Sequence, residues 1–258
     1  MLTRPDAPVQ REPIFNIPGI IIGLLALLAF IYFVQTYVLS DEQARLFLET
    51  FAFIPARYDS SVLGPAWPGG GGAEVWSFIT YSFFHASWMH FGLNAIWLLP
   101  FGTAVARRFG AYRFMAYYMV CAVAGALAHL ATHAGEPAPM IGASAAISGT
   151  MAGAMRFAFQ RGGPLSFWRS GGHSDYQVPA VPLSGVLREP AVLAFLVVWF
   201  GMNILFGFST LPVPGVGANQ VVAWQAHIGG FLAGLLLFSW FDPVPRSPQS
   251  RDIGAMHH

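Results

Sequence analysis

Residues 19–39 read GIIIGLLALLAFIYFVQTYVL, an apolar stretch without a charged side chain. A helix needs about 20 apolar residues to cross the hydrocarbon core of a bilayer, so this stretch is long enough to span a membrane. Comparable apolar runs recur at 88–106, 114–131, 141–159, 191–208 and 221–241. The sequence therefore predicts an all-α, polytopic membrane protein with a bundle of six transmembrane helices.

The overall composition also favours a membrane protein. Of the 258 residues, 55% are hydrophobic and only 10% are charged, whereas about 25% of the residues of a typical soluble domain are charged. The one cysteine, Cys121, lies inside an apolar run and cannot form an intramolecular disulfide, so we interpret it as a packing residue. No basic stripe with interleaved aromatic residues is present, and we expect no binding to nucleic acid.

The distribution of basic residues predicts the orientation of the spans. All 13 basic residues are arginines. If the N-terminus lies in the cytoplasm, only Arg45 and Arg57 fall on the outer side, which is the asymmetry that the positive-inside rule describes. We therefore expect both termini in the cytoplasm, the first helix as a retained signal anchor, and a location in the bacterial inner (cell) membrane.

The apolar runs divide the chain into a membrane domain and two tails. The polar residues 1–16 and 242–258 are predicted to be cytoplasmic tails, and residues 17–241 to form the membrane domain. Within that domain, residues 40–75 are predicted to be an external loop whose apolar first part dips into the outer interface. Residues 161–189 are rich in Gly, Pro and Ser, so they are predicted to be an irregular cytoplasmic insertion, to which we assign no chemistry.

Polar side chains interrupt three of the predicted spans, where they cost free energy and therefore suggest a function. They are His85, His90 and Asn94, then Ser144 and Ser148, then Gln225 and His227. With the N-terminus inside, all three spans enter the membrane from the external side. At about 1.5 Å per residue, His90, Ser144 and His227 then lie within about 10 Å of the outer boundary. One buried site in the outer leaflet is the simplest interpretation.

Ser144 and His227 are the residue types of nucleophilic catalysis. A serine hydroxyl needs a base to become nucleophilic, and a neutral imidazole suits that task near neutral pH. We prefer Ser144 to Ser148 because Ser144 lies nearer the start of its helix, where unpaired N–H groups can stabilise a developing negative charge. The small residue Gly142 leaves the approach to Ser144 open.

His90 and Asn94 are four residues apart, so they share one helical face and can direct donors to the same point. This is the arrangement of an oxyanion hole. His85 lies off that face near the helix mouth, where we expect it to position the external loop or water. A structural interpretation also exists, because serines in membrane helices often bond their own backbone and interior histidines are often hydrogen-bonded core residues.

The predicted helix of His227 has a face of small residues, namely Ala226, Gly229, Gly230, Ala233 and Gly234. Small residues let two helices approach closely. The helix of Ser144 offers a matching face at Gly149 and Gly153, so close packing of these two helices is expected to bring His227 to Ser144.

Three motifs follow one another in the chain: HxxxxHxxxN at His85, His90 and Asn94, GxS at Gly142 and Ser144, and AHxxG at Ala226, His227 and Gly230. Together they resemble the rhomboid family of intramembrane serine proteases over residues 76–241. The resemblance implies that Ser144 attacks the scissile carbonyl, that His227 is the general base, and that His90, Asn94 and the Ser144 backbone N–H hold the oxyanion. It also implies a six-helix core, single-span membrane proteins as substrates, and a fifth helix that influences substrate entry.

Two residues depart from the family pattern. Ala145 follows the nucleophile where the family usually has glycine, and Ser148 stands where it usually has an aromatic residue.

Two other classes of function remain open. The first is a catalytically inactive rhomboid-like protein that binds membrane clients, which typically lacks the serine or the histidine. The second is a small membrane transporter or metal-binding protein that uses His85, His90 and His227, although no Cys or carboxylate joins them. We expect transmembrane-protein substrates and the lipid bilayer as partners, and neither a cofactor nor a metal.

Overall fold

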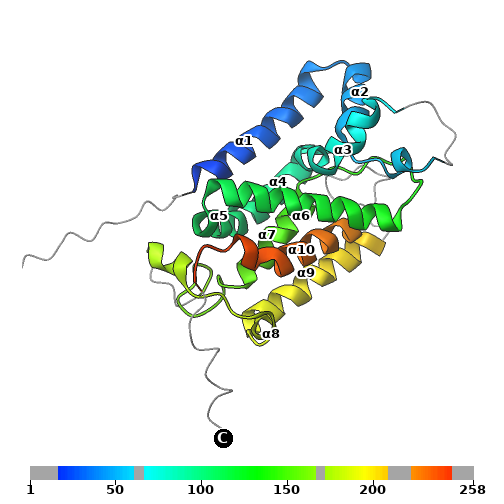
Figure 1. The fold of residues 1–258 in the computed structure, drawn as a ribbon. Coiled ribbons are helices and arrows are strands. Elements are labelled where there is room, and N and C mark those ends of the chain that lie inside the picture. The colour runs from blue at the N-terminus through cyan, green and yellow to red at the C-terminus, as the bar shows by residue number, and fades with distance from the viewer. Residues whose placement is uncertain (1–16, 61–66, 167–171, 209–221, 246–258) are drawn as a thin grey trace, which may run out of the picture.

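The computed structural model describes residues 17–60, 67–166, 172–208 and 222–245, whose arrangement is shown in Figure 1. The predicted tail at 1–16 and most of the one at 242–258 lie outside these ranges. The described part of the chain is built from helices and loops, and its β pairing is limited to one isolated bridge between Phe53 and Met140. The all-α prediction is confirmed.

The elements in chain order are α1 (Gly19–Phe33), η1 (Val34–Val38), α2 (Asp41–Phe51), η2 (Pro55–Tyr58), α3 (Gly70–Thr80), η3 (Tyr81–Phe83), α4 (Trp88–Trp97), η4 (Leu98–Gly102), α5 (Thr103–Phe109), α6 (Ala111–Thr132), α7 (Ser144–Met155), η5 (His173–Gln177), α8 (Leu183–Val186), α9 (Pro190–Phe208) and α10 (Trp224–Phe241).

Three helical stretches of the described chain are long and apolar enough to cross a membrane: Gly19–Val38, Trp88–Phe109 and Ala111–Thr132. In the second stretch, α4 and α5 are joined by the π-helical turn η4, which contains Pro100. Proline has no N–H and its ring clashes with the preceding turn, which accounts for the local change of helix type. Helices also form in the other three predicted runs, but the count of six spans stays a prediction.

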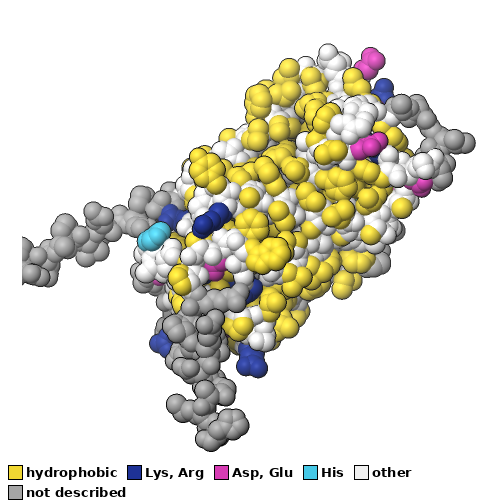
Figure 2. Space-filling model, viewed as in Figure 1, with side chains coloured by type: hydrophobic (Ala, Val, Ile, Leu, Met, Phe, Trp, Pro, Cys, Tyr) yellow, Lys and Arg dark blue, Asp and Glu magenta, His cyan; other side chains and the backbone are white. Residues whose placement is uncertain are grey.

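The surface agrees with a protein that faces lipid. Figure 2 shows hydrophobic side chains over most of the visible face between the two ends of the bundle, and charged side chains near those ends. Large exposed apolar residues include Phe30, Ile96, Val197 and Trp240. An apolar surface of this extent marks contact with a membrane rather than with water.

Helix α7 is shorter than the predicted run 141–159. It covers only Ser144–Met155, which at 1.5 Å per residue is about 18 Å and well short of the roughly 30 Å hydrocarbon core. The second residue of the run, Gly142, has φ +124°, a conformation that an α-helix cannot include. All α7 residues after Ser144 are buried in protein, so this short central helix does not need to reach across the lipid.

Helices α6, α7 and α10 form the most closely packed part of the fold. A Cβ atom added at Gly230 would clash with the backbone carbonyl of Ala145, and one added at Gly234 would clash with that of Gly149. Gly229 approaches the Ala124 carbonyl of α6 in the same way. The predicted close packing through small residues is therefore confirmed for α10 against α7, and α10 packs equally closely on α6.

The segment predicted as an external loop contains helix α2 and the start of helix α3, which lie at one end of the bundle in Figure 1. Phe53 exchanges two backbone hydrogen bonds with Met140, of 3.1 and 2.8 Å, and so fastens this segment to the stretch before Ser144. The Tyr58 hydroxyl donates to the Glu74 carbonyl and lies 2.8 Å from Ser77 Oγ. Partial burial raises the pKa of Tyr58, so the hydroxyl keeps its proton for these contacts.

The opposite end of the bundle is held by a buried arginine. Arg108 forms an ion pair with Asp242 at 2.8 Å and donates to the carbonyls of Tyr176 and Val178. The described residues of the predicted insertion 161–189 contain only the short elements η5 and α8. Arg108 therefore ties this connection to α5 and to the end of α10, on the side away from α2 and α3.

Candidate functional site

Ser144 is the first residue of α7, and Ala143 is the N-cap. The backbone N–H groups of the first turn of a helix have no intrahelical acceptor, and the helix dipole is positive there. The hydroxyl of Ser144 therefore stands beside unpaired N–H groups, one of which belongs to Ser144 itself.

Gly142 shapes the approach to Ser144 in two ways. Its φ of +124° is rarely accessible to residues with a side chain. A Cβ at this position would also lie only 2.9 Å from His90 Nε2 and 3.6 Å from Ser144 Oγ. The absence of a side chain at Gly142 thus lets the chain turn into α7. It also leaves a small space at this position, with the His90 ring and the Ser144 hydroxyl beside it.

His227 lies in the first turn of α10, and its Nε2 is 2.8 Å from Ser144 Oγ. The two residues are 83 positions apart in the sequence. The contact depends on Gly230 and Gly234, which let α10 press against the backbone of α7. The structure thus brings together the two residues that the sequence analysis singled out as nucleophile and base.

Ser148 is directed elsewhere. Its hydroxyl donates to the Ser144 carbonyl one turn earlier, at 2.7 Å. This back-bonding is common for serine inside helices. Ser144, rather than Ser148, therefore has its hydroxyl on His227, as the position at the helix start led us to expect.

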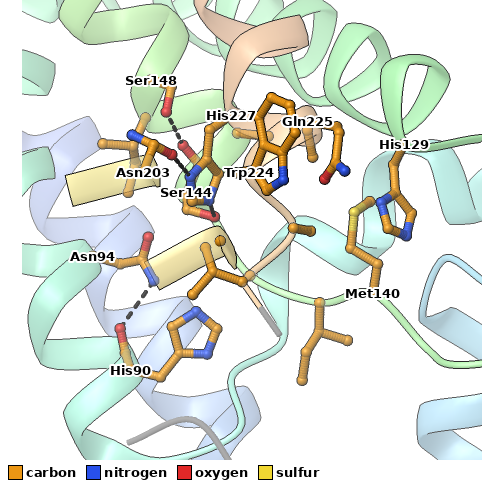
Figure 3. Close-up of a pocket in the computed structure, with 18 of the residues that line it drawn as sticks. His90, Asn94, His129, Met140, Ser144, Ser148, Asn203, Trp224, Gln225 and His227 are labelled. Atoms are coloured by element: carbon orange, nitrogen blue, oxygen red, sulfur yellow. Dashed lines mark hydrogen bonds between the residues drawn. The ribbon is translucent and has the colours of Figure 1, made fainter. Parts of the chain in front are cut away.

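His90 and Asn94 face the same cavity as Ser144 and His227 (Figure 3). The backbone N–H of Ala86 donates to His90 Nδ1 at 3.3 Å, so in the neutral ring Nε2 carries the proton, and this is the nitrogen beside Gly142. The Asn94 amide gives one N–H to the His90 carbonyl at 2.9 Å and retains a second. Both residues can therefore donate a hydrogen bond near Ser144.

The expected role of His85, to position the external loop or water, stays a prediction. The residue is fully buried, its ring lies edge-on against His90 at 5.1 Å between centroids, and it also contacts Phe91. It does not line the cavity. The chain turns sharply between η3 and α4, and this turn places His85 behind His90, where it supports the ring of that residue.

Asn203 was missed by the sequence analysis. Its Oδ1 lies 2.6 Å from His227 Nδ1, on the side of the ring away from Ser144. The residue belongs to α9 and is 7% exposed. A polar residue in the apolar run 191–208 was an available signal, since the same criterion selected Asn94 and His227.

The cavity around these residues has a volume of about 960 Å³. One side is lined by Met89 and Leu93 of α4 together with Val198 and Met202 of α9, all of which are also exposed on the apolar surface. The other end is lined by residues at and beyond the end of α6, including His129. In the described part of the chain, no group of three or more His, Cys, Asp or Glu side chains is arranged to hold a metal ion.

A family model described as the rhomboid domain matches residues 72–241. The human protein named Rhomboid-related protein 3 is 37% identical over 75 residues, which are 29% of this chain and 18% of that protein. The matched segment thus covers well under two thirds of this relative.

Proposed function

This chain belongs to the rhomboid family, and we propose that it is an intramembrane serine endopeptidase with Ser144 and His227 as its catalytic dyad. The observation that carries the proposal is the 2.8 Å contact between Ser144 Oγ and His227 Nε2 at the start of a buried helix. A serine hydroxyl in contact with an imidazole is the basic arrangement of an activated nucleophile.

In the proposed reaction, Ser144 Oγ attacks the scissile carbonyl carbon while its proton passes to His227 Nε2. The tetrahedral intermediate collapses, the peptide C–N bond breaks, and His227 returns the proton to the leaving amine. A water molecule then attacks the acyl-enzyme and gives a proton to His227. The ester C–O bond of the resulting tetrahedral intermediate breaks, His227 returns this proton to Ser144 Oγ, and the new carboxyl terminus leaves. No step requires a cofactor.

The negative charge on the tetrahedral oxygen requires donors, and three are available in the cavity that Ser144 lines. They are His90 Nε2–H, the second N–H of the Asn94 amide and the backbone N–H of Ser144. Fixed donors in a site shielded from water stabilise such a charge strongly and need no reorganisation during the reaction.

We propose transmembrane proteins as substrates because some residues that line the cavity are also exposed on the apolar surface. Met89 and Leu93 on α4, and Val198 and Met202 on α9, belong to both the cavity and the apolar surface. A segment that leaves a membrane helix can therefore reach Ser144 from the lipid side. The alternative of an inactive, client-binding protein is less well supported. Such a protein typically lacks the serine or the histidine, whereas here both are present and in contact.

A fluorophosphonate probe tests the proposal, because it reacts with a serine only when that serine is activated. We expect one adduct on purified protein in detergent, located by peptide mass spectrometry on Ser144. Labelling should persist in Ser148→Ala, because the Ser148 hydroxyl donates its hydrogen bond to the Ser144 carbonyl. It should vanish in Ser144→Ala. An adduct on Ser148, or equal labelling of Ser144→Ala, would overturn the assignment.

We further propose that the α2–α3 end of the bundle is external, and that both termini and the α8 end are in the cytoplasm of a bacterial cell. In a Cys121→Ala background, an impermeant maleimide added to intact spheroplasts should label cysteines at the exposed positions Ser60 and Ala134. Cysteines at Tyr112 and Ser174, which are also exposed, should react only after lysis. The reverse pattern would invert the topology.

A further inference from the structure

The side of His227 that faces away from Ser144 is occupied by an amide whose orientation is fixed. The Asn203 side chain contacts two groups, the Trp199 carbonyl at 2.8 Å and His227 Nδ1 at 2.6 Å. A carbonyl oxygen can only accept a hydrogen bond, so the amide atom that faces Trp199 is the nitrogen. The amide oxygen of Asn203 therefore faces His227.

This orientation determines which nitrogen of the His227 ring carries the proton. The amide oxygen can only accept, so His227 Nδ1 must donate to it as N–H. In a neutral imidazole the other nitrogen is then an unprotonated acceptor. That nitrogen is Nε2, which lies 2.8 Å from Ser144 Oγ and must be free of a proton to act as a base.

We infer that Asn203 is a positioning residue that holds His227 in the tautomer able to accept the Ser144 proton. The inference rests on the proposed dyad, and it adds a third helix to the two that carry the dyad, because Ser144, His227 and Asn203 come from α7, α10 and α9. Asn203 takes up no proton itself. When Nε2 receives the proton from Ser144, Nδ1–H remains bonded to the amide oxygen, which stabilises the imidazolium.

The surroundings of Asn203 keep its amide in place. Trp199, one turn earlier on α9, stacks on Phe231 of α10 with ring centroids 4.7 Å apart. This aromatic contact anchors the turn of α9 whose carbonyl accepts from Asn203. The side chain of Asn203 is buried, so water does not compete freely for the His227 N–H.

Replacement of Asn203 by leucine, which has a similar shape but no acceptor, is expected to lower kcat roughly 10- to 100-fold while KM changes little. Asn203→Asp retains an acceptor oxygen at the same distance from the backbone and should recover much of the loss. Ile204→Ala is the matched control on α9, because Ile204 is exposed and does not line the cavity. It should behave as wild type.

A measurement that needs no turnover separates this inference from the proposed function. In ¹⁵N-histidine-labelled protein in lipid, with His227 signals assigned by difference from His227→Gln, we expect a protonated Nδ1 and an unprotonated Nε2. In Asn203→Leu both tautomers should appear. An Nε2–H tautomer in wild type, or an unchanged tautomer and kcat in Asn203→Leu, would refute the role of Asn203. A lack of protease activity with the expected tautomer would instead refute the proposed function alone.

Discussion

Ser144→Ala and His227→Ala are each expected to reduce the rate of substrate cleavage by roughly 10⁴-fold or more, with the protein still inserted and folded. The two side chains meet at 2.8 Å and transfer one proton between them, so the loss of either removes nearly the whole effect of both. The double variant should therefore be no slower than either single variant.

The measurement is cleavage of a single-span model substrate in proteoliposomes, followed on gels as the appearance of both fragments. Ser148→Ala is the matched control, since it removes a hydroxyl on the same helix that bonds only the Ser144 carbonyl. It should retain activity within a few-fold. Wild-type rates in Ser144→Ala or His227→Ala would eliminate the dyad, and additive losses in the double variant would contradict a shared proton transfer.

His90→Ala and Asn94→Ala should each lower kcat by roughly 10- to 1,000-fold with a smaller change in KM. Oxyanion donors act mainly on the transition state, because only there does the substrate oxygen carry a full negative charge. His90 presents its Nε2 beside Gly142, and Asn94 has one amide N–H that its own helix does not use.

Steady-state kinetics in lipid at several substrate concentrations separates kcat from KM for these variants. His173→Ala is a suitable control, because it removes an exposed histidine from η5, close to the residues that Arg108 holds at the opposite end of the bundle. A rise in KM with an unchanged kcat would make His90 and Asn94 substrate-binding residues and leave the oxyanion to the backbone N–H groups alone.

Ala145 follows Ser144 at a position where the rhomboid family usually has glycine, and a glycine on α6 makes room for its side chain. A Cβ added at Gly125 of α6 would lie only 2.5 Å from the Cβ of Ala145. The methyl group of Ala145 therefore occupies room that the absence of a side chain at Gly125 provides. The additional carbon after the nucleophile is buried between α6 and α10 without displacing Ser144 from His227.

The sequence by itself determined the class of the fold and the chemistry of the site. Apolar runs such as 19–39 require helices in a membrane, because lipid offers no partner for exposed backbone groups. Polar residues inside such runs are costly, so His90, Ser144 and His227 could be selected from their composition and position alone. Both inferences depend on local properties of the chain, which the sequence contains in full.

The tertiary structure decided which atoms meet. The start of α7 at Ser144 and the burial of His85 behind His90 depend on how neighbouring segments are packed. Asn203 illustrates the reason most clearly. Nothing in the spacing of residues on α9 and α10 specifies that Asn203 faces His227 at 2.6 Å, because the distance between side chains on different helices follows from the relative placement of whole helices. Backbone contacts such as that of Gly230 with Ala145 fix this placement.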